Sequence, residues 1–167
     1  MRNRSVMIVV SSLCAGGAER IASEIANEWS SQGLRTGLLT FSNASADHYS
    51  LHAGVNRYTL DRISQSKTIF HALISNLRRI RAIREAVCDF GPSAVISFTE
   101  QVNAQVLCAM LWSGVPVIVS ERIDPRAHKV PRVWNIARKW LYPRAAALVV
   151  QTRSVALWAH EVVAQSR

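Results

Sequence analysis

Polar residues that could bind a ligand follow four apolar segments of the chain, directly where each segment ends. They form four groups: Ser11, Ser12, Gly16 and Gly17; Thr99, Glu100 and Asn103; Glu121, Arg122 and His128; and Gln151 with Thr152. If the apolar segments are parallel strands, their carboxyl ends share one edge of a sheet and the four groups converge there. Convergent polar groups at such an edge predict a binding site for a polar ligand.

The first group has the most informative pattern. The apolar run at 6–10 predicts a buried strand, and the two glycines follow it after a short loop. A helix is predicted directly after them, because apolar residues recur at helical spacing: Ala18, Ile21, Ala22, Ile25, Ala26 and Trp29. A helix N-terminus favours an anionic ligand, and Gly16 and Gly17 would let that ligand approach the backbone closely. The alternative is that these glycines only form a tight turn.

Two phosphate-binding motifs are excluded at this position. The dinucleotide fingerprint needs G-x-G-x-x-G with an acidic residue about 20 positions later, and neither is present. A P-loop needs a lysine after its last glycine, and none follows Gly17.

The other polar residues also have structural explanations, which the sequence leaves open. Glu121 and Arg122 could form a local ion pair, and His128 could be a surface or hydrogen-bonded histidine. Thr99 and Asn103 could simply cap helices.

The sequence does not contain the residue patterns that several classes of enzyme require. The sequence has no Ser-His-Asp order, H-E-x-x-H, paired-carboxylate motif or cluster of metal ligands, so a self-contained hydrolase or a metalloenzyme is not indicated, and no metal is expected. Cys14, Cys88 and Cys108 are scattered, which predicts neither a disulfide framework nor a zinc site. We expect Cys88 and Cys108 to be small core residues, and Cys14 to lie in the glycine loop, where it could be exposed.

The chain is strongly basic, with 20 Lys and Arg against 11 Asp and Glu and a net charge of +9. This balance favours an anionic partner. A long helix predicted at 68–88 has an apolar stripe of Ile69, Leu73, Leu77, Ile80, Ile83 and Val87. Its arginines, Arg78, Arg79, Arg81 and Arg84, are expected to face outward, either as a solvated face or as a surface facing an anionic membrane.

Strands and helices alternate along the chain, which predicts an α/β fold. Apolar runs indicate strands at 6–10, 35–41, 55–60, 94–98, 117–119 and 146–150. Helices are indicated at 18–29, 68–88, 103–112, 133–141 and 151–163, with Gly33 closing the first. We expect a Rossmann-like, doubly wound parallel sheet of six or seven strands in a three-layer αβα single domain, with the first strand central. No apolar run reaches the roughly 18 residues of a membrane span, so we expect a cytoplasmic protein.

Several segments resemble the N-terminal domain of family 4 glycosyltransferases, which have the two-domain GT-B arrangement. They are Gly-Gly-Ala-Glu-Arg at 16–20, Ile-Ser-Phe-Thr at 96–99, Asn103, Gly-Val-Pro-Val-Ile-Val at 114–119, Ser-Glu-Arg-Ile-Asp-Pro at 120–125 and Val-Val-Gln-Thr at 149–152. Within the family, the chain most resembles the subgroup that builds bacterial surface polysaccharides and glycan precursors on lipid carriers. The resemblance covers nearly the whole chain in order.

The resemblance implies a retaining transfer of a sugar from a nucleotide-sugar co-substrate to an acceptor hydroxyl, without a metal or other cofactor. It implies acceptor-binding roles for the matching residues, together with neighbours at the same strand ends: Gly16, Gly17, Glu19, Arg20, Thr99, Asn103, Glu121, Arg122 and His128. The expected partners are a glycan or lipid-diphosphate-linked acceptor and an anionic membrane surface on the inner side of the membrane. No nucleic acid is expected, because no aromatic residues alternate with the arginines.

The sequence departs from the family in two respects. Many members carry a histidine after the fourth strand, where this chain has Ser97-Phe98-Thr99, so the catalytic residues stay unassigned. The family's second domain binds the nucleotide-sugar through a Glu-x7-Glu element and a glycine-rich loop, and neither occurs here. We therefore expect residues 1–167 to be the acceptor-side domain alone, with the C-terminal nucleotide-sugar-binding domain absent and the isolated chain inactive. The alternative is a non-catalytic Rossmann-like module that binds a phosphorylated ligand or partner.

Overall fold

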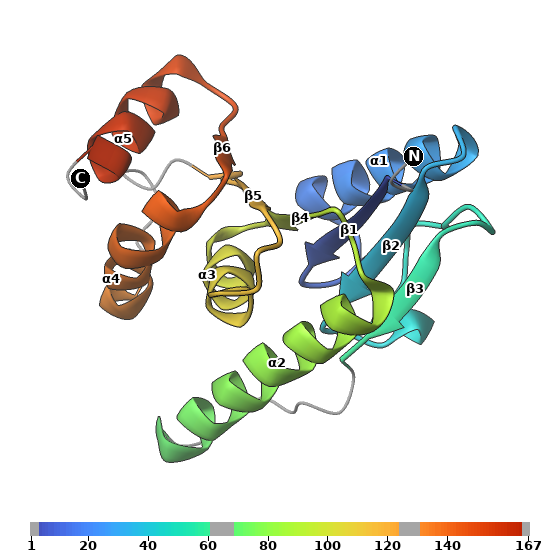
Figure 1. Ribbon diagram of the computed structural model, residues 1–167, viewed down its shortest axis with the longest axis horizontal. Helices are drawn as coiled ribbons and strands as arrows, with labels where there is room; N and C mark the ends of the chain where they lie inside the picture. Colours follow the sequence, from blue (N-terminus) through green and yellow to red (C-terminus); the bar gives the residue numbers. More distant parts are fainter. Residues whose placement is uncertain (1–3, 61–68, 124–130, 165–167) are drawn as a thin grey trace.

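The computed structural model describes residues 4–60, 69–123 and 131–164. Strands and helices alternate, as the sequence predicts (Figure 1). The strands are β1 (Ser5–Val10), β2 (Arg35–Thr40), β3 (Asn56–Thr59), β4 (Ala94–Phe98), β5 (Val117–Ser120) and β6 (Ala147–Val149). The helices are α1 (Gly17–Ser31), α2 (Ile69–Phe90), α3 (Glu100–Ala109), α4 (Arg132–Leu141) and α5 (Arg153–Ala164), with short 3-10 turns η1 (Ala44–Ala46) and η2 (Tyr142–Arg144).

The six described strands form one parallel sheet in the order β3-β2-β1-β4-β5-β6. The strand β1 is inside the sheet, between β2 and β4, and pairs Ile8 with Leu38 on one side and with Ile96 on the other. The predicted parallel pairing and the central first strand are therefore confirmed. All strand carboxyl ends, and the loops that follow them, lie at one edge of this sheet.

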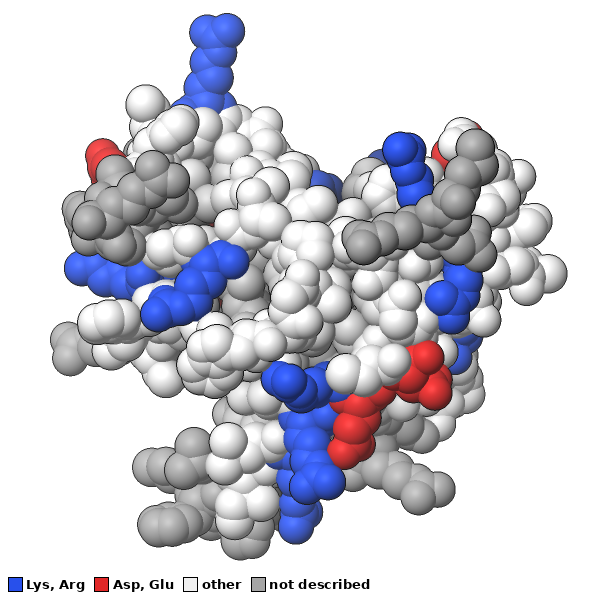
Figure 2. All heavy atoms as spheres, viewed as in Figure 1, with Lys and Arg blue, Asp and Glu red and all other residues white. Residues whose placement is uncertain are grey.

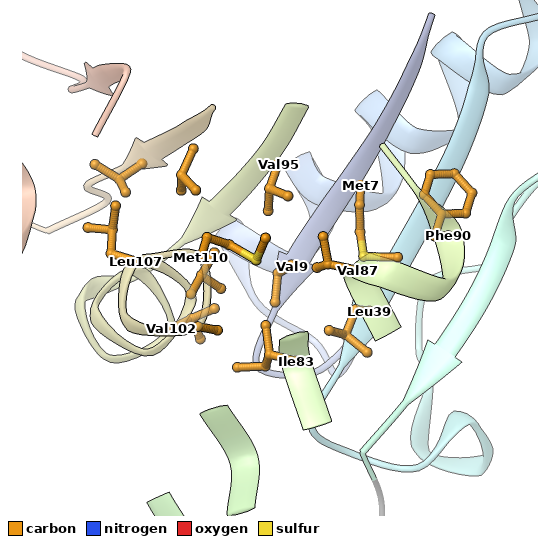
Figure 3. Packing of buried hydrophobic residues seen from close by; sticks show 14 of the residues in the cluster. Met7, Val9, Leu39, Ile83, Val87, Phe90, Val95, Val102, Leu107 and Met110 are labelled. Atoms are coloured by element: carbon orange, nitrogen blue, oxygen red, sulfur yellow. The ribbon is translucent and has the colours of Figure 1, made fainter. Parts of the chain in front are cut away.

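Helices cover the two faces of the sheet unequally. On one face α1 packs Ala22 and Ala26 against Ile8, Val10 and Leu38. On the other face α2 and α3 send side chains such as Ile83, Val87 and Val102 toward Met7, Val9 and Val95 (Figure 3). Figure 1 shows α2, α3 and α4 side by side below the sheet, and α1 on the opposite side. The doubly wound α/β fold expected from the sequence is thus confirmed.

Glycines set the ends of two helices. After α1, Gly33 has φ +81, and the Leu34 N–H donates to the Trp29 carbonyl, which closes the helix as predicted. After α2, Gly91 has φ +61. The sequence placed a break at 89–92, but α2 continues through Phe90 because the Phe90 ring is buried in the core.

Other boundaries differ from the prediction by a few residues. The helix expected at 103–112 begins at Glu100 and ends at Ala109, so Asn103 lies inside it and cannot be its cap. The last helix begins at Arg153, two residues later than expected. Cys88 is exposed and Cys108 is half-buried, so neither is a fully buried core residue, whereas Cys14 is exposed as anticipated. The loop expected at 62–67 lies outside the described residues.

The apolar residues of α4 are divided between two sides of the helix: Leu141 packs against the core, and Trp134 and Ala137 are half-buried. The sequence predicts an amphipathic helix here, with Trp134, Ile136, Ala137, Trp140 and Leu141 as its apolar residues. In the structure Ile136 is 58% and Trp140 68% exposed, whereas the charged Arg138 is only 3% exposed. Arg138 is buried because its guanidinium pairs with the buried carboxylate of Glu121, which is described below.

Candidate functional site at the carboxyl edge of the sheet

The glycine loop lies between β1 and α1. Gly16 has an extended backbone and precedes α1 without any side-chain cap. The Glu19 carboxylate folds back over it, since a Cβ on Gly16 would lie 2.3 Å from Glu19 Oε2, and Ser11 Oγ is 3.5 Å from Glu19 Oε1. By contrast, no atom lies within 4 Å of where a Cβ on Gly17 would stand. The first turn of α1 is therefore open at Gly17, next to a carboxylate that can accept hydrogen bonds.

Tyr49 holds this loop in place. Its hydroxyl accepts a hydrogen bond from the Gly16 N–H at 3.3 Å and donates to the Gly16 carbonyl at 3.1 Å. The backbone N–H groups of His48 and Tyr49 both donate to the Leu13 carbonyl. Sequence reasoning missed Tyr49, because the residue is 33 positions away in a polar loop that carries no motif.

Thr99 has a strained backbone at the end of β4. It has φ 70 and ψ 150 just before α3, and its side chain does not cap that helix. A β-branched residue in this region costs about 1–3 kcal/mol, and such residues cluster at functional sites. The Thr99 N–H donates to the Ser120 carbonyl, and the Asn103 N–H donates to the Thr99 carbonyl. These two hydrogen bonds keep Thr99 in the strained conformation.

Arg122 follows β5 and lies over the Phe98 ring, with its guanidinium carbon 5.8 Å from the ring centre. With the Gln151 amide oriented to satisfy both contacts, Gln151 donates to the Arg122 carbonyl and accepts from Arg122 Nη2, each at 3.1 Å. Phe98 belongs to the same buried cluster as Leu13 of the glycine loop. The polar groups that follow β5 and β6 thus contact each other through Arg122 and Gln151, and Arg122 also contacts the Phe98 ring, which directly precedes Thr99.

A buried polar network supports this edge from below. Asn103 is fully buried, and its amide oxygen accepts from Ser97 Oγ while its nitrogen donates to the Ser120 carbonyl and to the Tyr142 hydroxyl. Tyr142 in turn donates to Glu121 Oε2 at 2.6 Å. Glu121 Oε1 lies 3.2 Å from Arg138 Nη2, so the ion partner of Glu121 is Arg138 and not the adjacent Arg122.

The network shifts the pKa values of its members. Burial raises the pKa of Glu121, while the Tyr142 hydroxyl and the Arg138 charge act in the opposite direction. Burial and the neighbouring Glu121 raise the pKa of Tyr142 well above its ordinary value, so the hydroxyl remains a donor. Tyr142 and Arg138 were not singled out from the sequence, because their shared partner Glu121 lies at least 17 positions earlier in the chain and no local motif marks the contact.

The structure divides the predicted site residues into three sets. Gly16, Gly17, Glu19, Thr99 and Arg122 follow the neighbouring strands β1, β4 and β5 at the carboxyl edge of the sheet. Asn103 and Glu121 lie beneath it with protein partners, and they can act only through the residues that they hold. Arg20 is exposed and forms an ion pair with Glu24, one turn further along α1, with 3.7 Å between Arg20 Nε and Glu24 Oε1. His128 lies outside the described residues.

The predicted membrane-facing arginines on α2 are not equivalent. Arg78 is exposed, and Arg81 is exposed but pairs with Glu85 at 2.8 Å. Arg84 donates to the carbonyls of Ala109 and Leu111 at the end of α3, and Arg79 lies over the Phe41 ring at 5.0 Å. Arg84 is nevertheless exposed, whereas Arg79 is half-buried, so the expectation that all four arginines face outward is wrong for Arg79. Leu77, expected in the core, is 60% exposed.

The chemistry of the open edge is that of a binding surface. It offers a carboxylate, a guanidinium and helix N–H groups, which suit hydroxyls and anions. Within residues 4–60, 69–123 and 131–164 no group of three or more His, Cys, Asp or Glu could hold a metal ion. In the same part of the chain, no helix is long and apolar enough to cross a membrane.

Comparison with known proteins identifies the family of this chain. Residues 16–167 match the glycosyl transferase 4-like domain. The chain is 26% identical over 145 residues to a Campylobacter jejuni subsp. jejuni protein, the "GalNAc-alpha-(1->4)-GalNAc-alpha-(1->3)-diNAcBac-PP-undecaprenol alpha-1,4-N-acetyl-D-galactosaminyltransferase". That match covers 87% of this chain and 39% of the relative, so the chain spans about two fifths of the relative's length.

Two solved structures share the fold. Sucrose-phosphate synthase from Thermosynechococcus elongatus matches with a TM-score of 0.74 at 9% identity, over 96% of this chain and 45% of that one. MurG from Acinetobacter baumannii matches with a TM-score of 0.62 at 16% identity, over 91% of this chain and 42% of that one. These likenesses confirm the expected GT-B-type Rossmann-like architecture. Since the family model covers nearly all of the sequence, the chain belongs to the glycosyl transferase 4-like domain family.

Proposed function

We propose that this chain is the acceptor-binding half of a retaining glycosyltransferase, which moves a sugar from a nucleotide-sugar to a lipid-linked glycan in bacterial polysaccharide or glycan biosynthesis. The family match supports the transferase class. The acceptor proposal draws on the Campylobacter relative, whose name specifies a glycan on undecaprenyl diphosphate. The observation that carries it is the open first turn of α1 at Gly17, beside the Glu19 carboxylate.

The residues of the edge would divide the work between the two parts of such an acceptor. Glu19 would accept a hydrogen bond from a sugar hydroxyl, and the N–H groups at the start of α1 would face anionic oxygens. Arg122, which is only half-buried over Phe98, would add a guanidinium for the diphosphate. Thr99 would contribute through its strained backbone position. These roles agree with the basic balance of the chain.

The donor would be bound mainly by a second domain, so the chain by itself would not catalyse transfer. No metal or other cofactor would be needed, because the nucleotide-sugar is a co-substrate. The protein would work at the inner face of a membrane, where its lipid-linked acceptor resides. Arg78 and Arg81 on α2 are the arginines of that helix whose exposure suits an anionic surface.

The proposal can be tested by binding, without any need for turnover. A water-soluble short-chain prenyl diphosphate carrying a saccharide should bind the chain more tightly than a nucleotide-sugar does, as measured by calorimetry. Gly17→Val should abolish the binding, because the added side chain fills the open first turn. The variant should stay folded, because Gly17 does not have a positive φ and its Cβ would meet no atom within 4 Å.

A matched control is Ala53→Val, which adds a similar bulk at an exposed position of the loop before β3. Its acceptor binding should equal that of the wild type. Equal binding by Gly17→Val and wild type would show that the loop is only a turn. Binding of inorganic diphosphate as tightly as the saccharide-bearing acceptor would favour the non-catalytic phosphate-binding module.

A further inference from the structure

The inner side of α2 changes from apolar to polar where the helix passes the end of the sheet. In its second half this side packs Ile83, Val87 and Phe90 into the core (Figure 3). Asn76 and Arg79 precede Ile83 by about two turns and one turn, so they share its side of the helix. Because α2 connects the parallel strands β3 and β4, its first half lies at the carboxyl edge, and Figure 1 shows it extending beyond the strands.

Arg79 lies at this edge without an acidic partner. Its guanidinium carbon is 5.0 Å from the centre of the Phe41 ring, and Phe41 directly follows the end of β2. The side chain is half-buried, and its Nε–H has no hydrogen-bond partner among the described residues. Burial lowers the pKa of Arg79, and no carboxylate in the described part of the chain acts against this effect. An anion bound here would compensate for the water that the charge has lost.

Asn76 offers a second donor one turn before Arg79. Its Oδ1 accepts a hydrogen bond from Gln105 Nε2 at 2.9 Å, and Gln105 is only 2% exposed in α3. This contact fixes the Asn76 amide, whose nitrogen donates to none of the described residues. Arg79 and Asn76 are both half-buried, so part of each side chain remains accessible at the edge. The inner side of α2 thus offers N–H donors without matching acceptors.

The other arginines of α2 are either paired or fully exposed. Arg81 pairs with Glu85, Arg84 donates to two carbonyls of the α3 end, and Arg78 is exposed. In Figure 2, blue and red spheres lie side by side over the region that α2 occupies in Figure 1, so the outer side of this helix carries charges of both signs. Within the described helix, Arg79 is the arginine that is withdrawn from water without a compensating charge.

We propose that Arg79 and Asn76 bind a phosphate group at the carboxyl edge, as part of a phosphate ester or diphosphate ligand. A guanidinium can donate two parallel hydrogen bonds to phosphate oxygens, and the Asn76 amide adds a third. The contact with the Phe41 ring restricts the guanidinium, so little side-chain freedom is lost on binding. We call Arg79 and Asn76 the α2 phosphate site.

Two ligands of the proposed function carry such a phosphate, namely the lipid-diphosphate acceptor and the nucleotide-sugar. The inference rests on the proposed function only for this choice of source, because phosphate binding is measurable without either ligand. The α2 phosphate site also differs in place from the open first turn at Gly17, since α1 and α2 cover opposite faces of the sheet. Failure of Gly17→Val to affect acceptor binding and failure of an Arg79 variant to affect phosphate binding are therefore separate results.

The test measures the binding of inorganic diphosphate to the chain by phosphorus-31 NMR titration. Arg79→Gln should weaken binding at least about tenfold, because the charged donor is removed. The matched control is Arg78→Gln, which removes the same charge from the adjacent exposed position and should change the affinity less than about twofold. Asn76→Asp should also weaken binding about tenfold, because the new carboxylate can keep the contact with Gln105 but repels the phosphate.

A second measurement separates binding from folding. Arg79→Gln should leave the midpoint of urea unfolding unchanged or raise it, because it removes a half-buried charge that has no acidic partner in the described part of the chain. Added diphosphate should raise the midpoint of the wild type but not that of Arg79→Gln. Arg79→Lys should keep part of the affinity, since it retains the charge but not the paired donors.

The same variants identify the source of the phosphate. Weaker binding of the prenyl diphosphate saccharide, with unchanged binding of UDP-glucose, would assign the phosphate to the acceptor, and the reverse pattern would assign it to the donor. Equal losses in Arg78→Gln and Arg79→Gln, wild-type affinity in Arg79→Gln, or no diphosphate binding by the wild type would overturn the proposal. So would a lower unfolding midpoint of Arg79→Gln with unchanged affinity, because Arg79 would then serve only the fold.

Discussion

The Tyr142 hydroxyl joins two halves of the buried network, and its loss should be costly. It accepts from Asn103 and donates to Glu121, at 3.2 and 2.6 Å. Tyr142→Phe leaves a buried amide and a buried carboxylate each short of a partner, which costs about 1–3 kcal/mol. We expect the free energy of unfolding in urea to fall by that amount.

Tyr58→Phe is the matched control for this prediction. The Tyr58 hydroxyl donates to Asp89 at 3.1 Å in an exposed contact, where water can replace it. Its loss should change the free energy of unfolding by no more than about 0.5 kcal/mol. Equal effects of the two substitutions would mean that the buried network contributes no special stability.

The burial of Glu121 predicts that the stability of the protein depends on pH. Its pKa is raised above 4.5 by burial, so the folded protein binds a proton more tightly there than the unfolded chain does. The resulting stability is fully present below pH 4.5 and is lost as pH rises through the folded pKa. The free energy of unfolding of the wild type minus that of Glu121→Gln should therefore decrease as the pH rises above 4.5. A difference that instead grows with pH would show that the Arg138 charge outweighs burial.

At the scale of elements, hydrophobic periodicity was sufficient for most of the fold. Apolar runs identified all six described strands, and right-handed alternation with helices implied their parallel order. Helix ends were less predictable, because they depend on contacts distant in sequence. The last turn of α2 contains the buried Phe90, and α3 begins at Glu100, directly after the positive-φ Thr99.

The orientation of helices was where sequence patterns failed. Periodicity gives the angle between apolar residues but not which side meets the core when two candidate faces exist. On α4 the buried Glu121 pairs with Arg138 and so selects the side of the helix that faces inward, and on α2 Leu77, which was predicted to belong to the core stripe, is exposed. The candidate site was predictable from strand ends, whereas its supports Tyr49 and Tyr142 come from segments without a motif.

At the scale of the whole molecule, the described strands share one carboxyl edge, and the proposed transfer would require a donor facing that edge. Moving a sugar between two substrates depends on holding the reacting atoms a few ångströms apart, which a single edge does not do for two ligands. We therefore predict that residues 1–167 alone transfer no sugar from any nucleotide-sugar, in an assay with radiolabelled donors and a lipid-linked acceptor. A polypeptide that joins the chain to a nucleotide-sugar-binding domain of the same family should restore transfer.

The joined polypeptide also allows effects on acceptor binding to be distinguished from effects on donor binding. Gly17→Val in it should abolish transfer to the acceptor, because the obstruction lies at the first turn of α1. Hydrolysis of the nucleotide-sugar by water, where it occurs, should persist, since water needs no space at Gly17. If the variant instead lost donor hydrolysis together with transfer, the glycine edge would serve the donor. Robust transfer by residues 1–167 alone would mean that this one domain binds both substrates.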